Sequence, residues 1–281
     1  MADKSDMLLC VNDLKIHFKD AAPDRFAVNG VSFGMKKGEI LGLVGESGSG
    51  KTVTAMAISG LLPENAADTW GNITLDGREL LQCDRKSLQD LQGDEISVVF
   101  QEPMTSMNPL LRVGPQVEEC LRIHTKLSRK ERKDKALEAL QQVDLPDPED
   151  VYRKYPHELS GGMLQRAMIA AAIINKPQLL LADEPTTALD VTIQEEILKL
   201  LIRLNQETNT AILFISHNLN VVRKLCGRVI VMQRGIIVEN GSTEDVFYNP
   251  QHEYTKKLIA AIPTREHRMV ADWTRSLISS V

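Results

Sequence analysis

The chain has 281 residues, of which 43% are hydrophobic and 25% are charged, and its formal net charge is −5. This length and composition are typical of a folded globular protein and exclude a disordered chain or a disulfide-rich one. The acidic balance disfavours a protein that covers nucleic acid, because such domains carry a basic face. We therefore expect no nucleic-acid partner.

The sequence carries no signal of secretion, of a cysteine metal motif or of a membrane span. The four cysteines are far apart and form no CxxC pair, which favours a reducing compartment. The N-terminus is polar and lacks a signal-like apolar run, and no window reaches about 18 uninterrupted apolar residues. We expect a chain that does not cross a bilayer by itself.

Short apolar runs alternate with amphipathic stretches along the chain. Residues 8–35 alternate like antiparallel strands, and residues 72–77 resemble a hairpin strand that ends in an Asp-Gly turn. Buried strands are predicted at residues 40–44, 96–100, 179–182, 212–215 and 229–232. Because strands that alternate with helices form parallel sheets, the prediction is an α/β fold with a mainly parallel sheet beside a small antiparallel β layer.

The pattern changes between about residues 103 and 159, where no strand-like run occurs and apolar residues recur at helical spacing. Pro146 and Pro148 are expected to break this helical insert into pieces. The charged stretch 126–135 could be a basic contact patch, but acidic residues interrupt it and favour a solvated helix face.

A phosphate-binding motif follows the strand that ends at Val44 and precedes a helical stretch over residues 53–62. Its glycines let backbone N–H groups face phosphate oxygens, and the helix N-terminus adds partial positive charge. The lysine supplies a charge for the β- and γ-phosphates and the threonine a hydroxyl for Mg²⁺. This strand-loop-helix context disfavours a mere glycine-rich turn. The residues predicted to bind ATP here are Gly45, Glu46, Ser47, Gly48, Ser49, Gly50, Lys51 and Thr52.

Two carboxylates end the apolar strand at residues 179–182, where parallel sheets place their ligand sites. Asp183 is predicted to bind Mg²⁺, directly or through water, and Glu184 to polarise the attacking water as general base. A plain helix N-cap region before Pro185 is the alternative, and the phosphate-binding motif disfavours it.

The run LSGGMLQR at residues 159–166 resembles the signature motif of ABC ATPases. A Ser-Gly-Gly turn that opens an Ala-rich helix makes a second anion site. The resemblance implies that this turn caps the ATP of an opposite subunit, so that two chains sandwich two nucleotides. The signature residues that it implies are Ser160, Gly161, Gly162 and Gln165.

Three further segments resemble the same family and occur in its order. Gln101 resembles the Q-loop, Ala188 to Asp190 resemble the D-loop, and His217 resembles the switch histidine. The resemblance implies that Gln101 senses Mg²⁺ and water and that Asp190 crosses the dimer interface. His217 would act in catalysis by contacting the γ-phosphate.

An aromatic upstream of the phosphate-binding motif resembles the family's adenine-stacking residue. Phe18 is the predicted stacker, since a flat π-face contacts a base without reading its identity. Phe26 competes for this role, and either ring could simply pack in the β layer.

The resemblance covers residues 8–263, which we predict to be one ABC ATPase domain with a helical subdomain at about residues 103–176. Residues 264–281 would be a short C-terminal extension. Several motifs, among them residues 249–255, are similar to the ATPase subunits of dipeptide, oligopeptide and nickel importers. Those subunits commonly continue into a cysteine-bearing tail that is absent here, so we expect no iron–sulfur cluster.

The resemblance implies a subunit that hydrolyses ATP with Mg²⁺ and energises an importer of peptides or of a small solute such as nickel. Its expected partners are a second ABC ATPase subunit, related or identical, two transmembrane permease subunits and an extracytoplasmic solute-binding protein. The chain would lie peripherally on the cytoplasmic face of the cell membrane. The alternatives are a soluble ABC ATPase that acts on DNA or ribosomes and a catalytically silent nucleotide-binding regulator.

Overall fold

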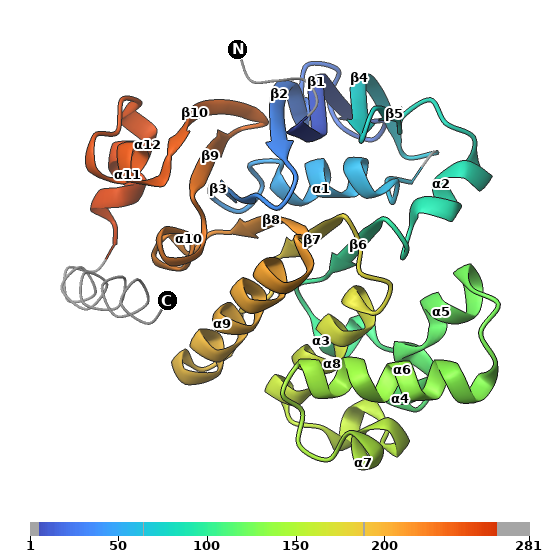
Figure 1. The fold of residues 1–281 in the computed structure, drawn as a ribbon. Helices are drawn as coiled ribbons and strands as arrows, with labels where there is room; N and C mark the ends of the chain where they lie inside the picture. Colours follow the sequence, from blue (N-terminus) through green and yellow to red (C-terminus); the bar gives the residue numbers. More distant parts are fainter. Residues whose placement is uncertain (1–5, 64, 188, 263–281) are drawn as a thin grey trace.

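Two sheets and two groups of helices make up the protein (Figure 1). The structure, a computed structural model, describes residues 6–63, 65–187 and 189–262. The predicted C-terminal extension and one D-loop residue, Ala188, lie outside the described residues. In the described residues, no helix is both long enough and apolar enough to cross a membrane.

The larger sheet has six strands in the order β10-β9-β3-β8-β7-β6, all parallel except β10, which runs antiparallel to β9. The five predicted buried strands are all present in it, which confirms the predicted α/β fold with its mainly parallel sheet. They are β3 (Ile40–Val44), β6 (Ile96–Val99), β7 (Leu179–Asp183), β8 (Ala211–Ser216) and β9 (Arg228–Gln233), and the sixth strand of the sheet is β10 (Ile236–Ser242).

The smaller sheet is antiparallel and confirms the predicted β layer. Its order is β2-β1-β4-β5, and the predicted Asp-Gly turn joins β4 to β5 with positive φ angles at Asp76 (46°) and Gly77 (80°). Helix α1 (Lys51–Ser59) lies between the two sheets (Figure 1), where Ala55 and Ile58 share one buried apolar core with both. The strands are β1 (Met7–Phe18), β2 (Val28–Lys36), β4 (Ala67–Leu75) and β5 (Arg78–Glu79).

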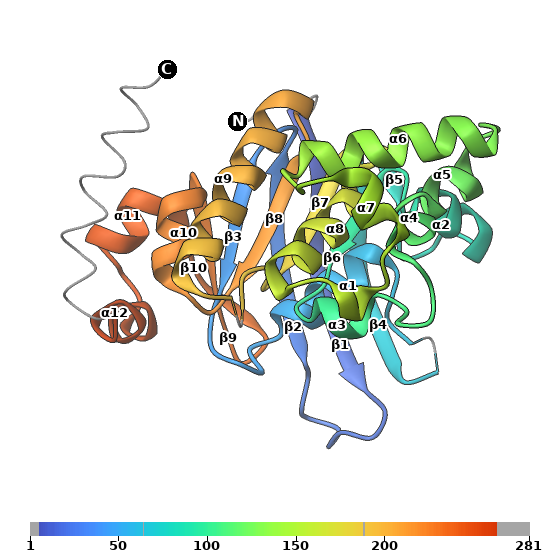
Figure 2. The ribbon, with the colours of Figure 1, turned by 90° about the horizontal axis from the view of Figure 1, so that it is seen from below.

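A second apolar core lies on the other face of the large sheet, under α8, α9 and α10. A group of short helices packs around α8 and projects to one side of the sheet, while α11 and α12 lie at the opposite side (Figure 2). The helices are α2 (Arg85–Leu91), α3 (Pro103–Ser106), α4 (Val113–Val117), α5 (Glu119–His124), α6 (Arg129–Gln142), α7 (Pro148–Arg153), the short 3₁₀ helix η2 (Pro156–Glu158), α8 (Gly161–Ile173), α9 (Val191–Thr208), α10 (Leu219–Leu225), α11 (Thr243–Tyr248) and α12 (Glu253–Ala260).

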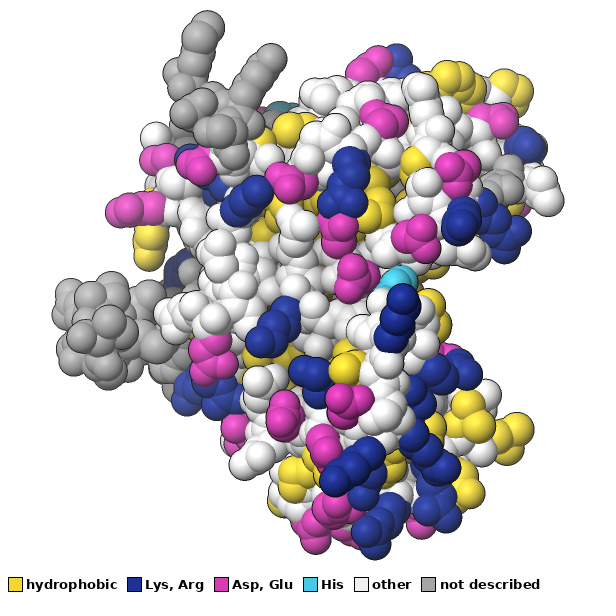
Figure 3. Space-filling model, turned by 45° about the vertical axis from the view of Figure 1, so that its right-hand side comes forward, with side chains coloured by type: hydrophobic (Ala, Val, Ile, Leu, Met, Phe, Trp, Pro, Cys, Tyr) yellow, Lys and Arg dark blue, Asp and Glu magenta, His cyan; other side chains and the backbone are white. Residues whose placement is uncertain are grey.

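The helices between α3 and α8 match the predicted insert, which we call the helical subdomain, although the domain boundaries stay a prediction. Its helices break at the two predicted prolines, because α6 ends before Pro146 and α7 begins at Pro148. Lys and Arg side chains gather over this part of the molecule (Figure 3). Several of them pair with acidic neighbours, as Lys133 does with Glu149, which fits the predicted solvated face.

Ion pairs join the helical subdomain to α9. Arg166 of the signature segment donates from Nη2 to Glu196 Oε2 (2.8 Å) and from Nη1 to the carbonyl of Val143 (2.8 Å). Arg203 of α9 reaches back to Asp144 Oδ2 (2.9 Å). The Arg166 side chain is only 11% exposed, so these charge-assisted bonds are partly shielded from water and fix α8 against α9.

Candidate nucleotide site

A cavity of about 590 Å³ opens at the carboxyl ends of β3, β7 and β8. Its size lies within the ordinary range for small-molecule sites, and open α/β sheets bind ligands at this edge. The lining residues come from segments far apart in the chain, and most of them are predicted site residues. They are Gly45, Glu46, Ser47, Gly48, Gly50, Lys51, Thr52, Val53, Gln101, Glu184, His217, Leu219 and Leu258.

The phosphate-binding motif forms a tight loop between β3 and α1. Gly45, Gly48 and Gly50 all have positive φ (152°, 76° and 101°), a region that favours glycine. A Cβ at Gly45 would also collide with the carbonyl oxygen of Met232, so a side chain there would displace the loop. The sequence therefore dictates this curvature, which turns the loop backbone toward the cavity.

The N-terminus of α1 is free to hold an anion. Its N-cap, Gly50, has no side chain that could bond the first backbone N–H groups of the helix. Those groups, together with the helix dipole, favour a negatively charged ligand such as phosphate. The helix begins at Lys51, two residues earlier than predicted, and ends at Ser59 because Gly60 adopts a left-handed conformation.

Lys51 is folded back over the loop. Its Nζ donates to the carbonyl oxygens of Gly45 (2.8 Å) and Glu46 (2.9 Å), and the residue is 5% exposed. Burial lowers the pKa of Lys51, and the nearby Glu184 and Asp183 carboxylates oppose that shift. A phosphate anion in the cavity would replace the carbonyl dipoles with a full negative charge.

Asp183 ends β7 beside the loop, as the strand pattern predicts. Its side chain is buried, and no described residue bonds its Oδ1. Burial raises the pKa of Asp183, helped by the Glu184 charge, while a hydrogen bond from Thr52 and the Lys51 charge lower it. A buried carboxylate oxygen without a partner, next to a threonine hydroxyl, offers the hard oxygen ligands that Mg²⁺ prefers. The residues present therefore fit Mg²⁺.

Glu184 gathers side chains from three segments. Its Oε2 accepts from Gln101 Nε2 (3.1 Å) and from Thr187 Oγ1 (3.0 Å), and its Oε1 lies 2.9 Å from His217 Nδ1. Glu184 has a positive φ of 47°, and its backbone N–H donates to the carbonyl oxygen of Ile215, the residue before the end of β8. These contacts hold the carboxylate at the wall of the cavity in one orientation, as a general base requires.

The signature turn and the two described D-loop residues, Leu189 and Asp190, lie together at a second place, outside the cavity lining. Ser160 caps α8 by accepting from the Met163 N–H (3.3 Å), and the exposed Asp190 caps α9 by accepting from the Ile193 N–H (3.0 Å). A Cβ on Gly162 would lie 2.9 Å from Ile193 Cγ2, so the two helix starts are packed closely. None of the signature residues lines the cavity beside the chain's own phosphate loop.

Gln165 differs from the other signature residues because it is only 1% exposed. Its amide nitrogen is buried and has no hydrogen-bond partner among the described residues. Its contact with the ATP of an opposite subunit stays a prediction that this conformation does not favour.

Both candidate adenine-stacking rings belong to the β layer. Phe26 packs against the rings of His17 (centroids 5.4 Å apart) and Trp70 (6.0 Å). Phe18 is half-buried against the apolar core between the sheets. Neither ring lines the cavity, so the role of Phe18 stays a prediction and Phe26 stays its competitor.

Sequence reasoning missed three contacts of the site. Thr187 donates to Glu184, and Leu258 of α12 lines the cavity. The third is Tyr254, whose hydroxyl accepts from the Glu46 N–H (3.0 Å). Residues 249–255 stood out as similar to one subfamily, but nothing in that pattern says that the segment returns to a loop some 200 residues earlier in the chain.

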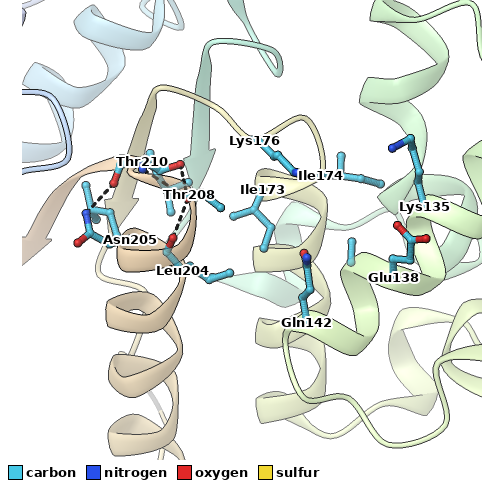
Figure 4. A pocket seen from close by; sticks show the side chains of 13 residues that line it. Lys135, Glu138, Gln142, Ile173, Ile174, Lys176, Leu204, Asn205, Thr208 and Thr210 are labelled. Atoms are coloured by element: carbon cyan, nitrogen blue, oxygen red, sulfur yellow. Dashed lines mark hydrogen bonds between the residues drawn. The ribbon is translucent and has the colours of Figure 1, made fainter. Parts of the chain in front are cut away.

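A second, smaller cavity lies between α6, α8 and α9 (Figure 4). Its volume is about 100 Å³, too small for a nucleotide. Its polar lining residues form hydrogen bonds with one another. Asn205 Nδ2 donates to the Thr210 carbonyl (2.8 Å), and Thr208 Oγ1 donates to the Leu204 carbonyl (2.7 Å). This crevice is structural.

Replacing Asp183 with asparagine should stabilise the empty protein at pH 7. Because the folded-state pKa of Asp183 is raised, folding at neutral pH buries an ionised carboxylate that loses solvation, and the wild type is destabilised. We expect Asp183→Asn to melt roughly 2–4 °C higher without nucleotide, about 1 kcal/mol for a chain of this size. The difference in melting temperature between the variant and the wild type should shrink in acid. As the pH falls, Asp183 is protonated in the folded protein at a higher pH than in the unfolded chain, and its desolvation cost is then lost.

Calorimetry across pH 4–8 measures this effect, with the exposed Asp134→Asn as control. An Asp183→Asn chain that melts below the wild type at pH 7 would show that the carboxylate is stabilising in the empty protein.

Comparisons with known proteins agree with this geometry. A sequence profile described as ABC transporter matches residues 28–187. The chain is 49% identical over 263 residues to the "Probable peptide ABC transporter ATP-binding protein y4tR" of Sinorhizobium fredii, covering 93% of this chain and 78% of that protein. It is 47% identical over 260 residues to the oligopeptide transport ATP-binding protein OppD of Bacillus subtilis, covering 92% of this chain and 73% of the relative.

Solved structures show the same fold. The ATP-binding cassette MJ0796, a dimer in a post-hydrolysis state with ADP and Pi, superposes with a TM-score of 0.75 at 30% identity and covers 84% of this chain and 99% of its own. The cassette cbiO1 of Clostridium perfringens, part of the ABC transporter complex cbiONQ, gives a TM-score of 0.74 at 28% identity over 94% of this chain and 99% of its own. The chain therefore belongs to the ABC transporter family and is one of its ATP-binding subunits.

Proposed function

We propose that the chain binds MgATP in the cavity at the carboxyl edge of the large sheet and hydrolyses it to drive a membrane transporter. One observation carries the proposal. The carboxylate of Glu184 is held by Gln101 and His217 at the wall of the same cavity that the phosphate loop lines. A loop suited to phosphates and an oriented general base are the two parts that nucleotide hydrolysis requires.

The polar residues in and beside the cavity have distinct tasks in this proposal. The loop N–H groups and Lys51 bind the phosphates, and Thr52 and Asp183 would hold Mg²⁺, which supplies positive charge that offsets charge on the phosphates. Glu184 accepts a proton from the attacking water. His217 keeps the Glu184 carboxylate in place and offers a second nitrogen toward the γ-phosphate.

The active unit is a pair of chains. The signature turn of one chain lies outside its own cavity, so it acts on the nucleotide of the opposite subunit, as proposed from the motif. The solved cassette that this chain resembles is itself a dimer with ADP and Pi. ATP then works by binding the closed pair more tightly than the open one.

A groove of about 390 Å³ suits a membrane partner. It runs between the core and the helical subdomain, and its lining includes Leu61, Phe100 and Met107. Phe100 is 43% exposed and stands next to Gln101 in the chain, so a partner in this groove would lie one residue from the catalytic cluster. Apolar surface of this kind marks an interaction site.

The transported cargo is proposed from relatives. Those named above are peptide and oligopeptide transport ATP-binding proteins, so we propose a peptide importer in which two permease subunits sit in the membrane and an extracytoplasmic binding protein supplies the peptide. The chain would then lie on the cytoplasmic face of the membrane. Nickel or another small solute is the competing cargo from the motif resemblance.

The test is to purify the chain from its own cell in mild detergent and measure phosphate release from ATP. We expect co-purification of hydrophobic membrane subunits and release that stops when EDTA removes Mg²⁺. Stimulation by DNA or ribosomes, without membrane subunits, would identify a soluble ATPase instead. Bound ATP without any phosphate release would identify a silent regulator.

A further inference from the structure

We propose that Tyr254 is a positioning residue for the phosphate loop, through which α12 sets the affinity of the chain for ATP. The inference rests on the proposed function, since it requires that the loop over Gly45 to Thr52 binds the phosphates. It extends that function to a residue of the C-terminal segment, some 200 positions away from the loop in the sequence.

The contact joins a side chain of α12 to the backbone of the loop. The Tyr254 hydroxyl accepts a hydrogen bond from the N–H of Glu46 at 3.0 Å, and Tyr254 itself is 8% exposed. Leu258, one helical turn later on the same face of α12, lines the nucleotide cavity. One face of this helix therefore touches both the loop and the space where the nucleotide would lie.

Among the described residues, two hydrogen bonds from later segments of the chain support the backbone of the loop. The turn between β9 and β10 holds its second half, because the N–H of Gly235 donates to the carbonyl of Ser49 at 3.0 Å. Tyr254 holds its first half, at Glu46. Of these two hydrogen bonds, only the one from Glu46 to Tyr254 involves a side chain. It can therefore be tested by removing the tyrosine hydroxyl oxygen.

Helix α12 is anchored well enough to act as a support. The Glu239 carboxylate of β10 accepts from the N–H groups of Gln251 (2.8 Å) and His252 (3.1 Å), just before the helix begins. His252 Nδ1 in turn accepts from the N–H of Tyr254 (3.1 Å), and Thr255 is 1% exposed. The position of the Tyr254 hydroxyl is thus fixed by the fold and not by the loop.

Loss of this hydroxyl would act on the empty loop. The N–H of Glu46 would lose its acceptor in a part-buried place, so the empty loop would sample other conformations. ATP would then bind only the fraction of chains in which the loop is formed, and the apparent dissociation constant rises by the reciprocal of that fraction. By linkage, bound nucleotide also strengthens the contact between α12 and the loop.

The experiment compares Tyr254→Phe with Tyr248→Phe in the full-length chain, because Tyr248 of α11 is 72% exposed and makes a matched control. We expect the dissociation constant for ATP to rise roughly three- to tenfold in Tyr254→Phe alone, with kcat at saturating ATP within about twofold. Hydrogen exchange of the amides at 46–50 should be faster in the empty variant and equal to wild type when ATP saturates the site.

The Lys51→Ala variant, measured in parallel, serves as the reference for the phosphate site, and three outcomes are distinguishable. Weaker binding with faster loop exchange supports the proposal, since a merely structural role would not produce an exchange difference that ATP removes. If Tyr254→Phe leaves affinity and exchange unchanged, or lowers only kcat, while Lys51→Ala still weakens ATP binding, the proposal is overturned. If Lys51→Ala binds ATP as the wild type does, the proposed site itself fails and the inference fails with it.

Discussion

Glu184→Gln should lower the rate of ATP hydrolysis at least about 100-fold and leave ATP affinity nearly unchanged. The substitution keeps the shape of the side chain and its bonds to Gln101 and Thr187, but an amide cannot take the proton of the attacking water. In the proposed function, ATP binding depends on the loop and Lys51, which the change does not touch. Two chains that close on ATP therefore stay closed, because the step that reopens them is blocked.

Size-exclusion chromatography with MgATP measures this trapped pair, and single-turnover phosphate release measures the chemical step. The exposed Glu207→Gln in α9 is a matched control and should behave as the wild type in both assays. Unimpaired steady-state hydrolysis by Glu184→Gln would remove Glu184 from the role of general base and leave Asp183 and His217 to be tested in its place.

Local patterns were enough to predict the sheet and the loop. A run such as residues 40–44 is apolar throughout, which a strand buried on both faces requires, and a glycine-rich loop must follow it where the chain turns sharply into α1. The structure has β3 at those residues and the loop directly after it. Helix ends were less predictable, since α1 starts at Lys51, directly after its glycine N-cap, and not at the first apolar residue.

Contacts between distant segments could not be predicted in the same way. Only the family resemblance predicted that Gln101 and His217 lie in one site with Glu184. The hydrogen bonds that join these three residues depend on the order of the strands in the sheet. The contact of Tyr254 with Glu46 had no signal, because a tyrosine in a C-terminal helix has no pattern that points to a loop near the N-terminus. The burial of Gln165 likewise depends on how α8 packs.

Lys51→Ala should weaken nucleotide binding strongly without unfolding the protein. The ammonium group is the only side-chain cation among the described residues that line the cavity, apart from the imidazole of His217. Charge-assisted bonds to phosphate contribute about 1.5–3 kcal/mol, so we expect ATP affinity to fall roughly 10- to 150-fold and hydrolysis to fall further. Equilibrium binding of ATP, followed by calorimetry, measures the loss, with the exposed Lys86→Ala as control.

The fold should tolerate this change because the buried ammonium is itself unfavourable in the empty protein. Burial lowers the pKa of Lys51 below its ordinary value of 10.5, so the unfolded chain holds this proton more tightly than the folded one. The wild-type protein therefore gains stability from this residue as the pH rises toward 10.5. At pH 7 that gain is absent, and Lys51→Ala should melt near the wild type, since its lost bonds to Gly45 and Glu46 are offset by the lost desolvation cost. A Lys51→Ala chain that folds normally and still binds and hydrolyses ATP would refute the phosphate loop as the nucleotide site.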